Sequence, residues 1–376
     1  MIIFGTRPEA IKMAPLIKKF SNSSSKLRPV ICVTAQHREL LDQVLKIFEI
    51  VPDYDLDVMT PNQSLFDVSA NALQKLEPFL KKEKPDLVLV QGDTTTSFVA
   101  SLAAYYFKTK IGHVEAGLRT ADKYSPFPEE MNRRLTDSLA DYYFAPTAGA
   151  RENLLREGVD EAKIYVTGNS VIDALLMIVE KQRDERVQRE LAQEFQGRHG
   201  ISLDNHRIIL VTGHRRESFG KEFENICRGL KQIAGHFQDV KIIYPVHLNP
   251  NVRCPVRKIL NNIGNIHLLE PLDYLSFIWL MNQSYLILTD SGGVQEEAPS
   301  LGKPVLVMRN TTERSEGIEA GTSRLVGTSS WTIFDGAALL LENAGLYAQM
   351  VRAINPYGDG KASERIAAVI FSELNS

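Results

Sequence analysis

Four acidic side chains follow predicted strands or turns of the chain and could serve together in acid–base catalysis. Asp93 follows one apolar segment, Glu115 follows the next, and Glu129 and Glu130 stand after a proline-rich turn. Because the carboxyl ends of parallel strands meet at one edge of a sheet, we expect these carboxylates to share a site. Crowded carboxylates raise one another's pKa, as general acid–base chemistry near neutral pH requires.

Each of these acidic residues also has a purely structural interpretation. Asp93 can cap the helix that is predicted to follow it. Glu115 can form an ion pair with Arg119. The two adjacent glutamates precede Arg133 and Arg134 by four residues, a spacing that gives salt bridges along a helix.

A glycine-rich segment with the sequence DSGGVQEE predicts a nucleotide site after another strand. Its Ser291, Gly292 and Gly293 stand at a predicted helix start, where backbone N–H groups can cradle a phosphate. Glu297 lies one helical turn further on, where its carboxylate can accept both hydroxyls of a ribose. The alternative is a glycine-rich connection whose acidic residues complement the helix dipole.

Cationic side chains follow three more predicted strands. Arg7 and Lys12 belong to the motif GTRPEAIK, where free N–H groups at a helix start could help to hold an anion. His214 and Arg215 belong to the motif GHRRE, and Arg314 belongs to a later loop; such groups suit a diphosphate. The alternative for the GTRPEAIK segment is an ordinary turn with solvated charges, and the alternative for His214 is a purely structural histidine.

Two further residues carry weaker signals. His247 also follows a predicted strand, and a turn histidine satisfied by the backbone is its structural alternative. Phe277 lies on an apolar helical pattern, where packing in the core is the default for an aromatic side chain.

The elements that must position these residues alternate between strand and helix along the whole chain. Regular alternation predicts α/β architecture with parallel sheets and helices on both faces. We expect two Rossmann-like, doubly wound domains facing across a cleft, with ligands beyond the carboxyl ends of the strands. The predicted strands are residues 1–4, 29–33, 87–91, 111–114, 142–145, 164–167, 208–212, 241–244, 266–269, 286–289 and 305–307.

Helical patterns and a linker place the domain boundary. Helices are predicted at 8–20, 37–48 and 94–107, and a long polar helix at 171–195 is followed by a loop at 196–206. The expected domains are 1–168, which carries the carboxylates, and 169–361, which carries most of the nucleotide site. A C-terminal helix, 362–376, is expected to pack back on the first domain.

Composition excludes several classes of protein. At 376 residues the chain fits two domains, and a net charge of −3 argues against broad nucleic-acid binding. It has no apolar run of the ~18 residues that a membrane helix needs, and no visible signal peptide, so we expect a cytoplasmic protein without membrane contact. Three widely spaced cysteines and the absence of dinucleotide, P-loop and HExxH motifs predict no disulfide framework, no nicotinamide cofactor and no metal site.

Taken in order, these motifs resemble one known family from Phe4 to Gly360. The similarity is to the non-hydrolysing UDP-N-acetylglucosamine 2-epimerases of bacteria. The matching stretches are FGTRPEAIKMAPL, TAQHREL, GDTTT, HVEAGLRT, PEEMNRRL, VTGNSVID, VTGHRRESFG, YPVHLNPNVR, TDSGGVQEEAPSLGKPV, TTER and NPYGDG.

The resemblance implies a GT-B-like fold and a reversible conversion of UDP-N-acetylglucosamine (UDP-GlcNAc) to UDP-N-acetylmannosamine (UDP-ManNAc). No added cofactor is implied, the product feeds surface polysaccharides, and the enzyme is expected to be a homodimer. UDP is a good leaving group, so loss of the C2 proton and of UDP gives a glycal, to which UDP returns while C2 is protonated on its opposite face.

The resemblance also assigns roles to residues of this chain. The implied catalytic residues are Asp93, Glu115, Glu129 and His214. The implied UDP-binding residues are Arg7, Lys12, Phe277, Ser291, Gly292, Gly293, Glu297 and Arg314. A second UDP-GlcNAc, acting as an activator, would contact Gln36, His37, Arg215 and His247.

Three departures from the family pattern and three rival functions remain. Asn71 stands where an arginine of the activator site is frequent, Gln91 where histidine is frequent, and Ser315 where proline is frequent. The rivals are a hydrolysing 2-epimerase that releases N-acetylmannosamine and UDP, a GT-B glycosyltransferase, and a non-catalytic nucleotide-sugar sensor. Which carboxylate removes the proton and which delivers it does not follow from the sequence.

Overall fold

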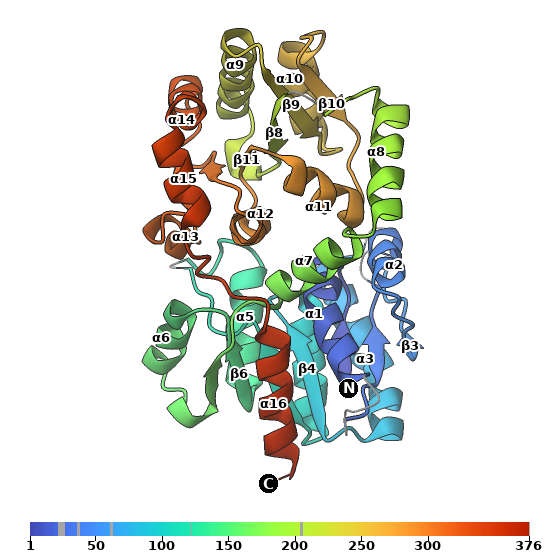
Figure 1. The fold of residues 1–376 in the computed structure, drawn as a ribbon. Coiled ribbons are helices and arrows are strands. Elements are labelled where there is room, and N and C mark those ends of the chain that lie inside the picture. Colours follow the sequence, from blue (N-terminus) through green and yellow to red (C-terminus); the bar gives the residue numbers. More distant parts are fainter. Residues whose placement is uncertain (22–26, 36–37, 61–62, 121, 204–205, 376) are drawn as a thin grey trace. The chain divides into compact units, whose positions relative to one another are not determined.

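The chain forms two compact units, one of which is built from both ends of the sequence (Figure 1). The computed structural model describes residues 1–21, 27–35, 38–60, 63–120, 122–203 and 206–375. The first unit comprises Met1–Ala174 and Tyr357–Ser376, and the second comprises Leu175–Pro356. The boundaries and roles expected for the two domains stay predictions.

Within the described residues, the first unit contains a seven-stranded parallel sheet in the order β3-β2-β1-β4-β5-β6-β7. Its central strands are short, apolar and buried, as is typical of a parallel sheet covered on both faces. The strands are β1 (Ile2–Phe4), β2 (Ile31–Val33), β3 (Tyr54–Asp55), β4 (Leu87–Gln91), β5 (Lys110–Val114), β6 (Tyr142–Ala145) and β7 (Ile164–Val166).

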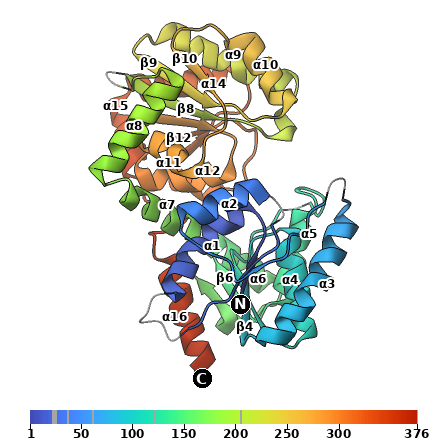
Figure 2. The ribbon, with the colours of Figure 1, turned by 90° about the vertical axis from the view of Figure 1, so that its right-hand side faces the viewer.

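Helices cover both faces of this sheet. The helices are α1 (Arg7–Phe20), α2 (Arg38–Ile47), α3 (Leu65–Glu83), α4 (Thr95–Tyr106), α5 (Glu129–Leu139), α6 (Ala148–Arg156) and α16 (Ala362–Asn375), with a 3-10 turn η1 (Glu161–Lys163). Helices α1 and α16 pack together on one face, whereas α3, α4 and α5 pack in sequence on the other (Figure 2). Helix α7 (Ser170–Lys181) runs from the first unit into the second.

The second unit repeats this architecture with a six-stranded parallel sheet among its described residues, in the order β10-β9-β8-β11-β12-β13. The strands are β8 (Arg207–Thr212), β9 (Val240–Pro245), β10 (Ile266–Leu269), β11 (Leu286–Thr289), β12 (Val305–Val307) and β13 (Ser323–Leu325). The helices are α8 (Glu185–His199), α9 (Lys221–His236), α10 (Pro250–Leu260), α11 (Tyr274–Gln283), α12 (Gly292–Glu297), α13 (Ser315–Glu319), α14 (Ser330–Glu342) and α15 (Ala344–Arg352), with 3-10 turns η2 (Arg216–Ser218) and η3 (Ala298–Leu301).

The order of each sheet fixes where a ligand can approach it. In the first unit β1 lies between β2 and β4, and in the second β8 lies between β9 and β11. At these positions the order in which successive strands are added to the sheet reverses. Ligands of such folds bind there, beyond the carboxyl ends of the strands. The turns after β1, β4, β8 and β11 are therefore the places to examine for chemistry.

Two sequence expectations are wrong in detail. The polar pattern at 171–195 is two helices, because the Asp184 side chain accepts the Arg186 N–H at 2.8 Å and starts α8 afresh. The predicted loop at 196–206 begins too early, since α8 continues to His199 and ends at Gly200 in a left-handed conformation. No strand is predicted at β3 or β13, because these two edge strands lack the buried apolar run that indicates a strand.

Candidate active site

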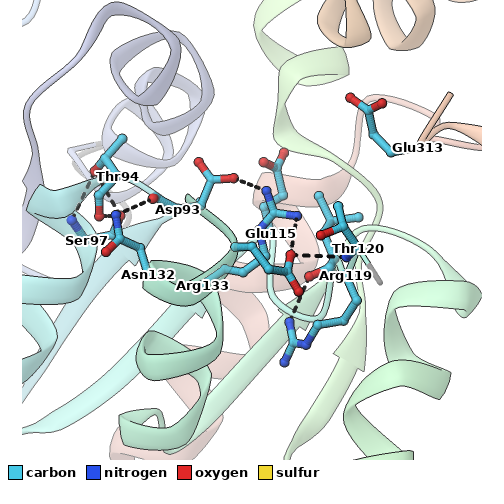
Figure 3. A network of polar contacts seen from close by, with 12 residues as sticks. Asp93, Thr94, Ser97, Glu115, Arg119, Thr120, Asn132, Arg133 and Glu313 are labelled. Atoms are coloured by element: carbon cyan, nitrogen blue, oxygen red, sulfur yellow. Dashed lines mark hydrogen bonds and ion pairs between the residues drawn. The ribbon is translucent and has the colours of Figure 1, made fainter. Parts of the chain in front are cut away.

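The turn after β4 presents the carboxylate of Asp93 at the carboxyl edge of the first sheet (Figure 3). Thr94, not Asp93, caps α4, because its hydroxyl accepts the Ser97 N–H at 3.1 Å. The capping interpretation of Asp93 is therefore wrong. Its carboxylate instead forms an ion pair with Arg133 of α5, and its backbone carbonyl accepts the Asn132 side-chain amide at 3.0 Å. Both partners come from one helix, so α5 fixes Asp93 from two sides.

The turn after β5 presents Glu115, whose backbone has a positive φ of 68°. Few residues other than glycine adopt this left-handed conformation, and where it persists it often marks a functional position. The carboxylate is 8% exposed and lies 2.5 Å from Lys12 Nζ and 2.7 Å from Asn169 Nδ2. Arg119 binds Asp137 and Glu157 instead, so the interpretation of Glu115 as its partner is wrong.

The carboxylates of Asp93 and Glu115 belong to neighbouring strand ends. Gln91 and Val114 are paired across β4 and β5; Glu115 directly follows Val114, and Asp93 follows Gln91 after Gly92. A Cβ atom added to Gly92 would lie 3.7 Å from Glu115 Oε1, so the Glu115 carboxylate lies over the turn that carries Asp93. The structure thus brings these two predicted residues together.

The adjacent glutamates at the start of α5 differ from one another. Glu130 is fully buried and binds Arg134 at 2.9 Å, as the helix salt-bridge interpretation expects, and it also accepts the Thr120 N–H at 3.1 Å. Glu129 makes no such bridge within the described structure, and its Oε2 is buried without a hydrogen-bond partner there. Only Glu129 therefore keeps a carboxylate oxygen available for another role.

The motif GTRPEAIK is organised by a residue that the sequence analysis passes over. Buried Glu9 accepts the N–H groups of Gly5 at 3.1 Å and Thr6 at 2.8 Å, and the Thr94 hydroxyl at 2.7 Å. Burial raises the pKa of Glu9, although these hydrogen bonds oppose the rise. Glu9 therefore takes up the two N–H groups that precede α1, and the capping-box spacing from Thr6 to Glu9 is the signal that reveals it. Arg7 begins α1 directly after them.

In the second unit, the turn after β8 holds His214 and Arg215 against a buried carboxylate. Asp290 Oδ2 accepts the backbone N–H groups of His214 at 2.7 Å and Arg215 at 2.8 Å. The His214 ring stacks on His247, with 5.4 Å between ring centroids. Burial lowers the pKa of His214; Asp290 opposes this, whereas Arg215 and His247 add to it. Asp290 is the second residue that the sequence analysis misses.

Replacing Asp290 tests this anchoring directly. We expect Asp290→Ala to lower the free energy of unfolding of the second unit by about 1–3 kcal/mol for each N–H that loses its partner. Both tryptophans of the chain, Trp279 and Trp331, lie in this unit, so tryptophan fluorescence during denaturant unfolding reports on it. Asp290→Asn can still present an amide oxygen to both N–H groups and serves as the control. Equal stability of the alanine variant and the parent protein would contradict the anchoring role.

The turn after β11 places Ser291, Gly292 and Gly293 at the start of α12, as the sequence predicts. The Ser291 N–H donates to the Thr289 hydroxyl at 2.9 Å. A Cβ atom on Gly292 would lie 3.4 Å from Arg314 Cζ, so the Arg314 guanidinium covers this turn. The glycine-rich turn and Arg314, both of which are predicted to bind phosphate, therefore lie next to each other in the second unit.

Neighbouring glutamates of α12 hold the surrounding side chains. Glu296 is buried and binds Arg314 Nε at 2.8 Å. Glu297 is also buried and accepts the Tyr274 hydroxyl at 2.6 Å, which ties α11 to α12. Phe277 is half-buried one turn after Tyr274 on α11. The predicted ribose acceptor and the predicted aromatic residue thus stand on two helices that Tyr274 links.

An ionised glutamate balances the arginines of this loop. Glu313 lies 2.6 Å from Arg309, 3.4 Å from Arg314 and 3.6 Å from Arg215. Burial alone would raise the pKa of Glu313, but Arg314 and Arg309 hold it at about 2. The loop therefore offers fewer net positive charges than its arginines suggest.

Of the predicted activator residues, only two can be placed. Arg215 and His247 belong to the second unit, at the ends of β8 and β9. Gln36 and His37 lie outside the described residues, and Asn71 is half-buried on α3. The activator site stays a prediction.

The described residues contain neither a metal-binding cluster nor a membrane-spanning helix. Among the described residues, no group of three or more His, Cys, Asp or Glu side chains could hold a metal ion. In the same part of the chain, no helix is both long and apolar enough to span a membrane.

Comparison with known proteins gives consistent matches over the whole chain. The profile of a family described as UDP-N-acetylglucosamine 2-epimerase matches residues 19–371. The chain is 56% identical over 367 residues to the UDP-N-acetylglucosamine 2-epimerase of Escherichia coli K12, covering 97% of this chain and 96% of that one.

Solved structures agree with the sequence matches. UDP-GlcNAc 2-epimerase from Neisseria meningitidis, bound to UDP-GlcNAc, is similar with a TM-score of 0.92 at 49% identity, covering 99% of each chain. A complex of S. aureus MnaA with UDP has a TM-score of 0.87 at 48% identity, covering 100% of this chain and 96% of that one. The predicted α/β architecture with two parallel sheets is confirmed.

Proposed function

The chain belongs to the UDP-N-acetylglucosamine 2-epimerase family, and we propose that it interconverts UDP-GlcNAc and UDP-ManNAc as a non-hydrolysing enzyme. The observation that carries this proposal is the pair of strand-end carboxylates, Asp93 and Glu115, each in contact with a cation. Inversion at C2 needs acid–base groups at the sugar, and this edge of the first sheet supplies them.

The proposed reaction is an elimination followed by an addition. A carboxylate removes the C2 proton, the C1–O bond breaks, and UDP leaves with the electron pair of that bond. The product is a glycal with a double bond between C1 and C2. UDP then bonds again to C1 while a second acid–base group delivers a proton to the opposite face of C2, so that atoms and charge balance without a redox step.

The carboxylates are proposed to share this work. Asp93, Glu115 and Glu129 are the acid–base candidates, and the free Oε2 of Glu129 supports its inclusion. His214 is proposed to act beside the diphosphate, where its stacked and partly buried ring can exchange a proton or a hydrogen bond. The order in which the carboxylates act is left to the experiments below.

The other predicted residues are proposed to bind UDP and to retain it during the reaction. The turn at Ser291–Gly293 and the Arg314 guanidinium that covers it would hold the phosphates. Glu297 would accept the ribose hydroxyls, Phe277 would lie beside the uracil, and Arg7 and Lys12 would add positive charge. The relatives from N. meningitidis and S. aureus were solved with UDP-GlcNAc and UDP, respectively, which supports these ligands.

Deuterium incorporation tests the proposed reaction. In deuterated water we expect both UDP-GlcNAc and UDP-ManNAc to acquire deuterium at C2 while the sugar remains attached to UDP, as followed by NMR. The reason is that the proton delivered to C2 comes from a group that exchanges with solvent.

The other outcomes identify the rival functions. Free N-acetylmannosamine together with UDP would point to a hydrolysing 2-epimerase. A sugar with its C2 proton unchanged would contradict epimerisation and leave a glycosyltransferase or a nucleotide-sugar sensor. The Asp93→Asn protein is the control for net inversion, because it lacks one proposed acid–base group but keeps the residues proposed to bind UDP.

Three implied properties stay predictions. They are a homodimeric state, a cytoplasmic location and a supply of UDP-ManNAc for surface polysaccharides. Activation by a second UDP-GlcNAc at Arg215 and His247 is a fourth, and Asn71 departs from the pattern expected for it.

A further inference from the structure

His113 is a buried titratable residue that the proposed reaction does not use. It lies within β5, and its side chain has no exposed surface. Its Nδ1 lies 2.6 Å from Asp137 Oδ1, and its Nε2 lies 2.8 Å from the backbone carbonyl oxygen of Gly92. A buried imidazole held at both nitrogens cannot turn, so its position is fixed by its two partners.

Both of these partners accept hydrogen bonds and cannot donate them. Gly92 contributes a carbonyl oxygen. Burial alone would raise the pKa of Asp137, but His113 and Arg119 bring it below its ordinary value, so the side chain is a carboxylate. Each ring nitrogen of His113 therefore faces a hydrogen-bond acceptor.

Asp137 extends this pair into a network of hydrogen bonds and ion pairs. Its Oδ2 accepts the Gly117 N–H at 3.2 Å and lies 2.8 Å from Arg119 Nη2. Arg119 in turn donates to both carboxylate oxygens of Glu157, at 2.8 and 2.6 Å. The ion pair between Arg119 and Asp137 offsets part of the cost of burying the Asp137 carboxylate.

The network touches every segment that carries a proposed acid–base carboxylate. Gly92 directly precedes Asp93, Gly117 stands two residues after Glu115, and Asp137 belongs to α5, which begins at Glu129. Resting on the function proposed above, we propose that the His113–Asp137 pair is a positioning device that sets the three carboxylates relative to one another.

The backbone of these turns shows why they need such anchors. Gly92, Glu115 and Gly117 all have positive φ values, of 71°, 68° and 84°. A Cβ atom on Gly117 would lie 2.3 Å from the Ala150 carbonyl oxygen, so this turn is also closely packed. Turns in sparsely populated conformations persist only where surrounding contacts determine them. The His113 ring and the Asp137 carboxylate supply those contacts.

Two substitutions of His113 separate its two links. In His113→Gln the amide nitrogen can take the place of Nε2 and donate to Gly92, whereas in His113→Asn it takes the place of Nδ1 and faces Asp137. We expect His113→Asn to lower kcat for epimerisation by about 10²-fold, because a shift of about 1 Å in a reacting group has that effect. We expect His113→Gln to keep kcat within about 10-fold of the parent value, and KM to change by less than about 3-fold in both.

A matched variant controls for simple destabilisation. Tyr143 donates its hydroxyl to the backbone carbonyls of Asp137 and Ala140, at 2.9 and 2.8 Å, and not to the Asp137 carboxylate. Tyr143→Phe therefore loses buried hydrogen bonds at the end of the same helix. We expect a lower melting temperature but an unchanged kcat for this variant.

A measurement on the unmodified protein keeps the proposal testable even if both His113 variants fail to fold. In protein labelled with ¹⁵N-histidine, we expect a ring N–H proton of His113 to remain observable and to exchange slowly with solvent, because the buried ring is bonded at both nitrogens. Rapid exchange of the ring N–H protons with solvent would overturn the proposal. So would parental kcat in His113→Asn, or a kcat for His113→Gln no higher than that of His113→Asn.

The carboxylate variants distinguish this proposal from the one on which it rests. If Asp93→Asn is inactive while His113→Asn is fully active, only the positioning role fails. If Asp93→Asn and Glu115→Gln both turn over substrate normally, the carboxylate roles themselves fail, and the positioning role fails with them.

Discussion

Asp93→Asn is expected to lower kcat for epimerisation by about 10²–10⁴-fold while UDP binds with nearly unchanged affinity. The amide has the size of the carboxylate and can still accept a hydrogen bond from Arg133, but it cannot take or deliver a proton. The turn itself should be preserved, because Thr94 caps α4 and Asn132 holds the Asp93 carbonyl. Steady-state kinetics gives kcat, and isothermal titration calorimetry gives the affinity for UDP.

A second aspartate provides the matched control for this substitution. Asp141 accepts the Ile111 N–H at 2.8 Å, at the start of β5 and therefore at the opposite edge of the same sheet. Asp141→Asn makes the same chemical change away from the candidate site, and its kcat should equal that of the parent. Near-normal turnover in Asp93→Asn would remove this residue from the reaction, whereas loss of UDP binding would show that the change disturbs more than proton transfer.

The strand ends are the part of the site that the sequence predicts well. Short apolar runs locate β4 and β5, and parallel pairing alone then places Asp93 and Glu115 side by side. The segment after β11 is equally informative, since glycines at a helix start have few other uses. Each of these inferences needs only local pattern and the rule that strand ends share an edge.

Partners from distant segments are the part that the sequence does not predict. Lys12 precedes its partner Glu115 by 103 residues, and Asp290 follows the His214 turn that it anchors by 76. Local pattern favours the nearby Arg119 as the partner of Glu115, and tertiary packing overrides it. No propensity indicates that Glu115 adopts a positive φ, because the conformation is imposed by its neighbours.

His113 lies between these two cases. A histidine inside an apolar strand signals a buried polar group that must have partners, because an unpaired one would destabilise the fold. The sequence thus indicates that partners exist, but their identity depends on how α5 packs against β5. Only the structure names Asp137 and the Gly92 carbonyl.

Glu115→Gln is the second substitution with a large expected effect, and net inversion should again fall by about 10²–10⁴-fold. Glutamine can keep the hydrogen bond with Asn169. It carries no negative charge, however, so Lys12 loses the carboxylate that lies 2.5 Å from its Nζ in the parent protein. Glu373→Gln, the same change on α16, is the matched control, and its kcat should equal that of the parent. Near-normal inversion by Glu115→Gln would exclude Glu115 as an acid–base group.

Isotope exchange by the two slow variants then shows which carboxylate serves which face of C2. A variant that keeps the group facing the C2 proton of UDP-GlcNAc can still remove that proton and return a deuteron to the same face. In deuterated water such a variant, supplied with UDP-GlcNAc, should label it at C2 without forming UDP-ManNAc. The complementary variant should label UDP-ManNAc alone when UDP-ManNAc is supplied. We expect Asp93→Asn and Glu115→Gln to give opposite patterns, because their carboxylates reach the turn from neighbouring strands. Identical patterns would mean that both residues act on one face, and the second acid–base role would then pass to Glu129.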